Sequence, residues 1–499
     1  MRGTGETDPM EGVAFPVLEG ERGTTATTRA ILADAARTVD PALADRIDAQ
    51  RDWRSRYLGA VREVTVASGR STGASAAMAG AGLASMRRRM VFERDGEEVA
   101  LQDALSVPPA GPAGMEEIVG TSPPARELAV PYRGRTLSGQ ALAEQLEDWV
   151  GRGIVEPGFA AAIGRVAAHP DWLGLPGCRV AVLGAGSELG PLVPLTVWGA
   201  HVLAVDLPEP RVWKRILQVA AAGAGRTTVP MRAGSEPPAE RAGLDLVRSL
   251  PEVREWLGTA AADDALVLGT YAYADRGMHV RVTAAADVLA TDLLARRPDV
   301  ALAYLATPTD AYLVPEAVVD ASRERHATGG GRPVRALRGP LRAASRGRLF
   351  VPSHSADEAP AGWGVADGLV PQQGPNYALA KRLQRWRGMD AAAAGHRVSF
   401  NVAPASWTRS VTKNRGLGAA YAGAHHFGVE IFARETTRTL MAAMLVHDLH
   451  APVSRPAHPE ALFADNAAHG GLWRAGYEPR SVLGLAALAG LPRALRPRR

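Results

Sequence analysis

The chain has 499 residues, of which 46% are hydrophobic and 22% charged, which is the composition of a globular protein rather than of a disordered or fibrous one. The net charge of +5 is small for this length and the basic residues are scattered, so nothing here indicates nucleic-acid binding. A single cysteine, Cys178, excludes an intrachain disulfide and a cysteine-based zinc cluster.

No apolar window is long enough to span a bilayer, and the first residues lack the apolar core of a signal peptide. We therefore expect a cytoplasmic protein without membrane contact. Residues 1–25 are rich in Gly, Thr, Glu and Pro, and we expect them to be disordered.

From residue 26 to 175 the apolar residues recur mostly at helical spacing, which predicts an additional, mostly helical N-terminal region. The Ala-, Gly- and Met-rich residues 72–90 predict a helix packed closely on another. Residues 106–125, rich in Pro and Gly, predict a loop or linker. Helical patterns at 138–150 and 157–168 resemble a DNA-reading helix pair, but they carry few basic residues, which favours a simple packed pair.

The rest of the chain is organised around a glycine-rich turn. An apolar run at 180–183 leads into Gly-Ala-Gly-Ser-Glu-Leu-Gly at 184–190, and a second apolar run at 201–205 ends in Asp206. Glycines let the backbone approach a pyrophosphate, a helix start supplies free N–H groups, and an acid about twenty residues further on accepts hydrogen bonds from a ribose. This order predicts a nucleotide or dinucleotide site made by Gly184, Gly186, Ser187, Glu188, Leu189, Gly190 and Asp206.

Further apolar runs alternate with helical patterns, which predicts an α/β fold with a mostly parallel sheet covered on both faces. These runs lie at 265–268, 300–305, 348–351 and 398–403. Pro308 and Asp310 follow one of them, at the carboxyl edge where such sheets bind ligands. Ser353 and Ser355 follow another, where a hydroxyl would hydrogen-bond a substrate carbonyl or, alternatively, cap a turn.

Tyr377 and Lys381 lie four residues apart in a helical pattern, and therefore on one face of a helix. An ammonium beside a phenol lowers the pKa of the phenol toward neutrality, which suits a group that passes a proton. A surface contact between the two side chains is the alternative. The run at 398–403 ends at Pro404, and the backbone from there to Thr408 is suited to hold a cofactor ring.

The order of glycine-rich turn, acid, serine-bearing strand, Tyr-x-x-x-Lys helix and strand followed by proline resembles the short-chain dehydrogenase/reductase superfamily. The resemblance covers residues 176–450, with 451–499 as a C-terminal cover and basic tail. It implies a Rossmann-type, doubly wound parallel sheet that binds NAD or NADP.

The same resemblance implies a role for each site residue. Tyr377 would be the general acid/base, Lys381 would bind the cofactor ribose and tune Tyr377, and Ser355 would orient the substrate oxygen, with Ser353 as its neighbour. Asp206 would bind the adenosine ribose, which favours NAD over NADP. The basic residues that follow it qualify that preference; they are Arg211, Lys214 and Arg215.

The chain also departs from the family pattern. Glu188 replaces the middle glycine of the turn, and His354 stands in register with the family's serine. An inserted loop near 359–364 separates the serines from Tyr377. We find no match to the Asn-Asn-Ala-Gly stretch or to the fourth catalytic asparagine.

The sequence therefore predicts hydride transfer between a nicotinamide and a carbonyl or alcohol substrate. Two alternatives stay open: an S-adenosylmethionine-dependent methyltransferase, which the glycine turn and acid also suit, and a catalytically silent nucleotide-binding scaffold. The adjacent His425 and His426 do not predict a metal site, because on a helix they would point about 100° apart. The apolar pattern at 436–446 predicts either a core helix or the subunit interface of a homo-oligomer.

Overall fold

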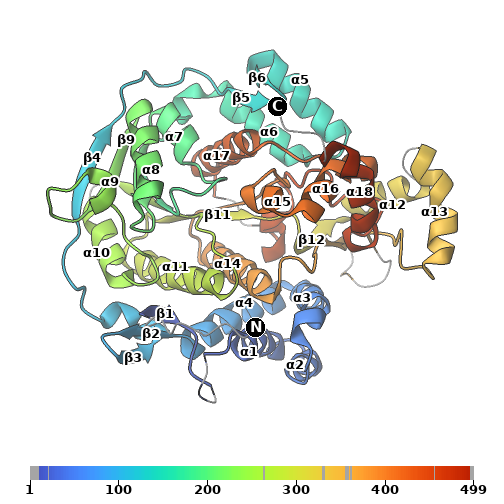
Figure 1. Cartoon of the computed structure of the whole chain (residues 1–499), viewed down its shortest axis with the longest axis horizontal. Coiled ribbons are helices and arrows are strands. Elements are labelled where there is room, and N and C mark those ends of the chain that lie inside the picture. Colours follow the sequence, from blue (N-terminus) through green and yellow to red (C-terminus); the bar gives the residue numbers. More distant parts are fainter. Residues whose placement is uncertain are drawn as a thin grey trace.

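A seven-stranded sheet runs through the middle of the molecule and helices cover both of its faces (Figure 1). The computed structural model describes residues 11–18, 20, 22–261, 264–328, 332–354, 359, 362–453 and 456–494. The strands lie in the order β14 (Val398–Val402), β11 (Ala301–Ala306), β10 (Ala265–Thr270), β7 (Cys178–Leu183), β8 (His201–Val205), β9 (Arg226–Met231) and β4 (Gly114–Val119). β4 pairs antiparallel with β9, and the other pairings are parallel. The fold is thus mixed α/β with a mostly parallel central sheet, as predicted.

The central strands are apolar along most of their length because both faces of the sheet are buried. Successive side chains of a strand point to opposite faces. In β7, Ala181 and Leu183 belong to the core on one face, whereas Val180 and Val182 belong to the core on the other. Both cores are closed by helices.

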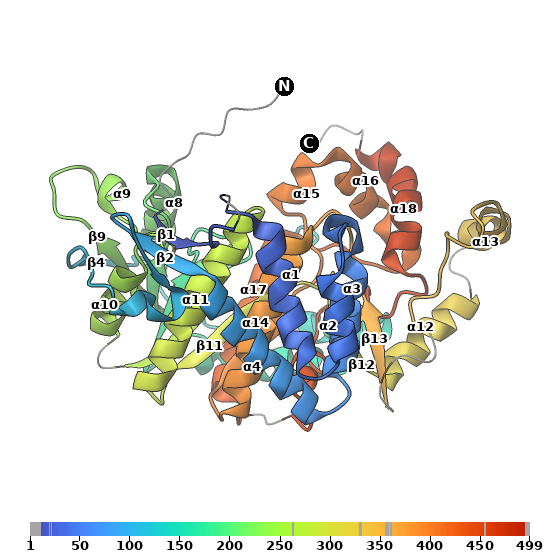
Figure 2. The same cartoon turned by 90° about the horizontal axis from the view of Figure 1, so that it is seen from below.

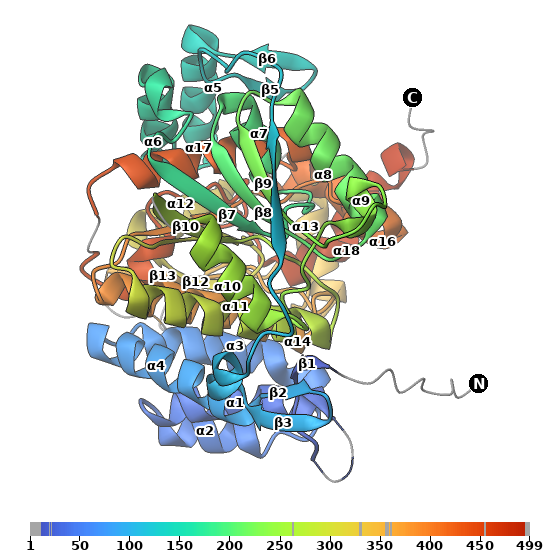
Figure 3. The same ribbon diagram turned by 90° about the vertical axis from the view of Figure 1, so that its left-hand side faces the viewer.

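Two layers of helices lie on the first face (Figure 3). The inner layer is α10 (Leu250–Ala260), α11 (Gly277–Arg296) and α14 (Pro375–Ala393), and the outer layer is α1 (Thr24–Arg37), α2 (Pro41–Asp48), α3 (Trp53–Ser68) and α4 (Thr72–Arg89). A Cβ at Gly82 of α4 would lie 2.2 Å from the ring of Trp386 on α14, so the two helices approach closely only because Gly82 has no side chain. Asp287 of α11 accepts hydrogen bonds from Arg87 of α4 and Arg387 of α14, both at 2.7 Å.

The second face is covered by helices from both halves of the chain. They are α5 (Gly139–Gly151), α6 (Pro157–Ala168), α7 (Leu192–Trp198), α8 (Pro210–Ala222), α9 (Pro238–Arg241) and α17 (Arg434–His450), with the short 3-10 helix η2 (Pro170–Trp172). α5 and α6 pack against each other, and α6 packs on α17, so the prediction of a simple packed pair is confirmed.

Smaller elements surround this body. A three-stranded antiparallel sheet is made of β1 (Gly12–Ala14), β2 (Val91–Arg94) and β3 (Glu97–Ala100), followed by η1 (Leu101–Ser106). Two hairpins are β5 (Val130–Tyr132) with β6 (Arg135–Leu137), and β12 (Ala311–Pro315) with β13 (Trp363–Asp367). The remaining helices are α12 (Glu316–Thr328), α13 (Arg332–Ala344), α15 (Arg409–Lys413), α16 (Arg415–Gly423), η3 (Ala424–Phe427), η4 (Pro459–Phe463) and α18 (Pro479–Ala494). α13 projects from the body (Figure 2).

The predicted strand at 348–351 is wrong. The backbone has positive φ at Arg346, Gly347 and Phe350, with φ of 52°, 80° and 56°, which is incompatible with an extended strand. The apolar side chains there instead form a small cluster in which Phe350 packs with Tyr477 and Val482. The other predicted strands of the central sheet are confirmed.

The prediction that residues 106–125 form a loop or linker is also wrong in part, because β4 lies within them. β4 is an edge strand with mostly exposed or half-exposed side chains, and it gives no apolar run. Among the helices of the described residues, none is long and apolar enough to cross a bilayer.

The packing of α4 on α14 gives a stability prediction. Gly82→Ala should lower the free energy of unfolding by about 1–3 kcal/mol, because the new methyl group overlaps the buried Trp386 ring. The matched control is Gly80→Ala on the same helix, which is exposed with no atom within 4 Å of its added Cβ and should gain about 0.5–1 kcal/mol. Urea denaturation of both variants measures the difference, and equal effects would contradict this packing.

Candidate functional site

The segments that follow β7, β10 and β11 lie side by side, because neighbouring parallel strands end at the same edge of a sheet. The glycine-rich turn follows β7, and residues 271–273 follow β10. Gly184 has a φ of 82°, and a Cβ there would lie 2.4 Å from the Cα of Ala272, so only glycine fits this contact. The Tyr273 ring in turn lies 6.1 Å from that of Tyr377. The turn and Tyr377 therefore share one edge.

Tyr377 and Lys381 lie in the first two turns of α14, whose start is set by Pro375 at its first position. The side chain of Thr307 lies close enough to the Tyr377 phenol to act on its ionisation. Lys381 Nζ lies 5.8 Å from the centre of the Tyr377 ring. It donates hydrogen bonds to the Leu305 carbonyl at 3.1 Å and to Gln384 Oε1 at 3.0 Å.

Burial dominates the ionisation of both groups. It raises the pKa of Tyr377 well above its ordinary value; Tyr273 adds to the effect, and the Thr307 side chain opposes it. Burial lowers the pKa of Lys381 to about 8, against the opposing charge of Asp310. The predicted lowering of the Tyr377 pKa is therefore wrong for the protein alone, since the ammonium is bonded to Leu305 and Gln384 instead of the phenol.

A hydroxyl beside Tyr377 comes from Thr307, a residue that the sequence did not single out. Thr307 directly follows β11, and its Oγ1 lies 2.7 Å from Oγ1 of Thr309, which also accepts a hydrogen bond from Gln373 Nε2 at 2.6 Å. The sequence analysis placed Pro308 and Asp310 of this segment at the ligand-binding edge but did not predict a role for Thr307 or Thr309. The available signal was their place directly after a buried strand.

Ser353 lies elsewhere, with His354 against β13 and around a small hollow lined also by Asp367 and Trp473. Its buried hydroxyl has no hydrogen-bond partner within the described part of the chain. Ser355 lies outside the described residues, as do 360 and 361 of the predicted inserted loop. The last two residues of that loop, Trp363 and Gly364, begin β13. The expectation that Ser353 ends a strand of the central sheet fails because 348–351 is not a strand.

A buried charge network holds the segment after β11 against α14. Arg385 Nη1 donates to Asp310 Oδ2 at 3.2 Å and to the Ala311 carbonyl at 2.6 Å, and Arg385 Nη2 donates to Glu460 of η4. Arg382 Nη2 lies 3.6 Å from Asp310 Oδ1. Burial alone would raise the pKa of Glu460, but Arg385 and Arg382 hold it below its ordinary value.

Asp206, directly after β8, binds the backbone of the glycine-rich turn. Its Oδ2 accepts the N–H of Gly186 at 2.6 Å and its Oδ1 accepts the N–H of Leu207 at 2.8 Å, while Arg215 donates to the Gly186 carbonyl. Burial raises the pKa of Asp206, although the two backbone N–H groups oppose this. Ser187 N donates to the Gly184 carbonyl at 2.9 Å, which tightens the turn.

Glu188 joins the turn to the segment that follows β14. Its Oε2 accepts the backbone N–H of Arg409 at 2.8 Å, and its Oε1 accepts from Arg434 Nη1 at 2.6 Å. Arg409 is the first residue of α15, directly after Thr408. These bonds place the predicted cofactor residue Thr408 next to the turn. Glu188, which stands where the family pattern has a glycine, thus links the turn to α15 and α17.

The other members of the predicted cofactor set take these places. Leu189 is partly buried, and a Cβ at Gly190 would lie 2.5 Å from the Ser187 hydroxyl, so a side chain there would displace that hydroxyl. Pro404 is buried directly after β14, with its Cβ 3.6 Å from the Cβ position of Gly470.

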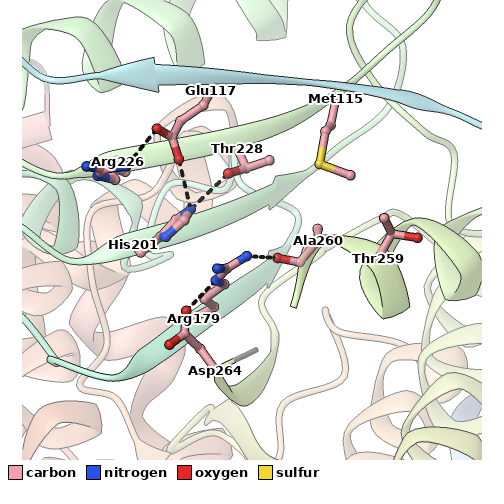
Figure 4. Close-up of a pocket in the computed structure, with 9 residues that line it drawn as sticks. All are labelled: Met115, Glu117, Arg179, His201, Arg226, Thr228, Thr259, Ala260 and Asp264. Atoms are coloured by element: carbon pink, nitrogen blue, oxygen red, sulfur yellow. Dashed lines mark hydrogen bonds and ion pairs between the residues drawn. The ribbon is translucent and has the colours of Figure 1, made fainter. Parts of the chain in front are cut away.

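A hollow of about 450 Å³ lies at the opposite edge, where β7, β8 and β9 begin beside β4 (Figure 4). Its charged side chains pair with one another: Arg226 lies 3.0 Å from Glu117, and Arg179 lies 2.7 Å from Asp264. None of the predicted site residues lines this hollow. The candidate site is therefore the carboxyl edge.

The rings of His425 and His426 lie 4.0 Å apart within η3. Across the part of the chain that the structure describes, no group of three or more His, Cys, Asp or Glu side chains is arranged to hold a metal ion.

Comparison with known proteins gave no match: no family model, no curated protein and no solved structure resembles this chain significantly. The function must therefore be argued from the residues themselves.

The pKa of Lys381 predicts a pH dependence of stability. Lys381 loses its proton near pH 8 in the folded protein and near 10.5 in the unfolded chain. Between these values the unfolded chain binds the extra proton, so raising the pH should stabilise the fold. The free energy of unfolding of the wild type minus that of Lys381→Met should be constant below pH 8 and rise toward pH 10.5, as measured by urea denaturation across this range. A flat difference would contradict the burial of the ammonium.

Proposed function

We propose that this protein is an NAD(P)-dependent oxidoreductase of the short-chain dehydrogenase/reductase type, acting on a carbonyl or alcohol substrate. The strand order supports the proposal. Leaving out β4, the order β9-β8-β7-β10-β11-β14 corresponds to the 3-2-1-4-5-6 order of a Rossmann fold. In such folds a dinucleotide lies across the point where the order reverses, here between β7 and β10, next to the glycine-rich turn.

The observation that carries the proposal is the set of side chains around Tyr377. A phenol, a hydroxyl from Thr307 and an ammonium from Lys381 meet at the carboxyl edge, on the edge that also holds the glycine-rich turn. This combination suits proton transfer to an oxygen atom, and a methyltransferase would not need it.

The residues of the turn fit a dinucleotide. The Asp206 carboxylate accepts one backbone N–H on each oxygen and keeps further lone pairs for ribose hydroxyls. Arg215 beside it tempers the preference for NAD over NADP. When bound, the nicotinamide supplies or accepts the hydride.

The protein's own residues supply the proton. Tyr377 keeps its proton at neutral pH because burial raises its pKa, which also makes the phenol a weaker acid. It donates that proton only as hydride addition turns the carbonyl oxygen into a strongly basic alkoxide. The Thr307 side chain lies beside the phenol and favours its charged form. The Lys381 ammonium, protonated below pH 8, stabilises the phenolate that remains.

Removing the phenol tests the role of Tyr377. Tyr377→Phe should lower kcat about 10²–10⁴-fold on a panel of carbonyl and alcohol substrates, because the general acid is lost. The NADH dissociation constant should stay within about twofold, since the ring and Lys381 remain. The matched control is Tyr304→Phe, a buried tyrosine of β11 that packs on Phe400, which should leave turnover unchanged.

The outcomes separate the three candidate functions. Unchanged turnover in Tyr377→Phe refutes its role as the acid. NADH binding without turnover by the wild type indicates the silent scaffold, and binding of S-adenosylmethionine in place of NADH indicates the methyltransferase.

The acid of the turn gives a second test. Asp206→Asn should weaken NADH binding about tenfold, through the loss of charged hydrogen bonds to the ribose, and should weaken NADPH binding less, because the repulsion of a 2′-phosphate disappears. Glu209→Ala, three residues on and exposed, is the control. Fluorescence titration with both cofactors measures the change. Equal NADH affinity in the wild type and Asp206→Asn would place the ribose elsewhere.

A further inference from the structure

His279 holds a buried nitrogen that the mechanism above leaves unused. It lies in the first turn of α11 with 1% of its surface exposed. Its ring stacks on Tyr377, with centres 5.4 Å apart and planes 17° from parallel, and it also contacts Tyr273 at 5.2 Å. Tyr273 is 57% exposed, so this aromatic group reaches from the interior to the surface.

The proton of His279 can be assigned from its contacts. Nδ1 accepts the backbone N–H of Ala274 at 3.4 Å and must therefore carry a lone pair. Burial, aided by the positive charge of Lys381, lowers the pKa of His279 to about 3, so the ring is neutral at pH 7. A neutral imidazole with an unprotonated Nδ1 has its proton on Nε2.

That Nε2–H has no acceptor among the described residues, although it is fully buried. Buried donors in folded proteins are almost always paired, and the exceptions call for an explanation such as a ligand that completes the pairing. The His279 ring contacts the rings of Tyr377 and Tyr273, and the charge of Lys381 acts on it.

The backbone holds this imidazole in a fixed and strained setting. Arg276, directly before α11, has a φ of 55°, a backbone conformation that residues other than glycine rarely adopt. A Cβ at Gly277 would lie 2.8 Å from Thr24 Cγ2 and 3.3 Å from the Phe15 ring, so the N-terminal segment packs directly on the start of α11. Strain of this kind is retained where the surrounding structure imposes it, and it is frequent at functional sites.

We propose that His279 is a second hydrogen-bond donor of the catalytic site, whose Nε2–H binds the same substrate oxygen that Tyr377 protonates. This inference rests on the proposed function and adds a substrate contact to it. A carbonyl oxygen would lie between a phenol and a neutral imidazole, and both donors would bind it more strongly as hydride addition gives it negative charge. The imidazole donates a hydrogen bond but transfers no proton, because a neutral imidazole that lost its Nε2 proton would become an imidazolate anion.

Two substitutions separate the donor from the ring. His279→Phe keeps an aromatic ring to stack on Tyr377 but removes the N–H, and His279→Gln replaces the ring but keeps an N–H donor. With NADH and any panel substrate that the wild type turns over, His279→Phe should lower kcat/KM about 10²–10³-fold, mainly in kcat, and His279→Gln should recover much of it. The NADH dissociation constant should not change in either variant.

A spectroscopic measurement tests the proton assignment without any substrate. In ¹⁵N-labelled wild-type protein at pH 7, the imidazole resonances that disappear in His279→Gln should show a protonated Nε2 and an unprotonated Nδ1. A protonated Nδ1 overturns the proposal, whatever the activity.

The failure of this inference can be told apart from failure of the proposed function. Equal kcat/KM in the wild type and His279→Phe overturns the role of His279 and leaves the oxidoreductase assignment standing. A wild type that turns over no substrate of the panel overturns both.

Discussion

The buried ion pairs of Asp310, Arg385 and Glu460 are the constraint on which the rest of the site depends. Each of the three side chains is at most 2% exposed, so their charges are stable only while all of them are paired. They come from the segment after β11, from α14 and from η4, and Ser68 of α3 donates to Glu460 at 2.8 Å. Four distant parts of the chain are thereby fixed to one another, and with them the place of Thr307 relative to Tyr377.

This network explains why α14 needs the N-terminal helices. Arg382 donates to Thr65 of α3 at 2.7 Å, and Trp386 packs on Gly82 of α4. Without these helices the outer face of α14, which carries its arginines and its tryptophan, would be open to water. The first part of the chain is thus built into the support of the site, which accounts for a layer beyond those that cover the sheet directly.

The same burial sets the electrostatics of the site. Taking Tyr377 and Lys381 out of water favours the neutral form of each, so the phenol keeps its proton and the pKa of the ammonium falls to about 8. Asp310 opposes this fall, and so the network that holds the helix also keeps Lys381 protonated at neutral pH. A protonated phenol beside a cation is suited to giving up a proton in carbonyl reduction, because the cation stabilises the phenolate left behind.

The sequence by itself determined the elements that depend on neighbours along the chain. Apolar runs predicted the main strands of the sheet, spacing of four placed Tyr377 and Lys381 on one helix face, and Asp206 was predicted directly after its strand. Each of these rests on local periodicity, which a single segment shows by itself.

The tertiary structure decided what depends on segments distant in sequence. It brought Thr307, which the sequence did not single out, to Tyr377, buried His279 against the same phenol, and added β4 to the edge of the sheet. It also raised the Tyr377 pKa, which the sequence had predicted to be lowered. The burial of the phenol depends on many segments that surround it, whereas the Tyr–Lys spacing considers only one pair of side chains. The apolar run at 348–351 is not a strand for a similar reason. Its side chains are buried against Tyr477 and Val482, and the local sequence pattern does not predict the positive φ at Phe350.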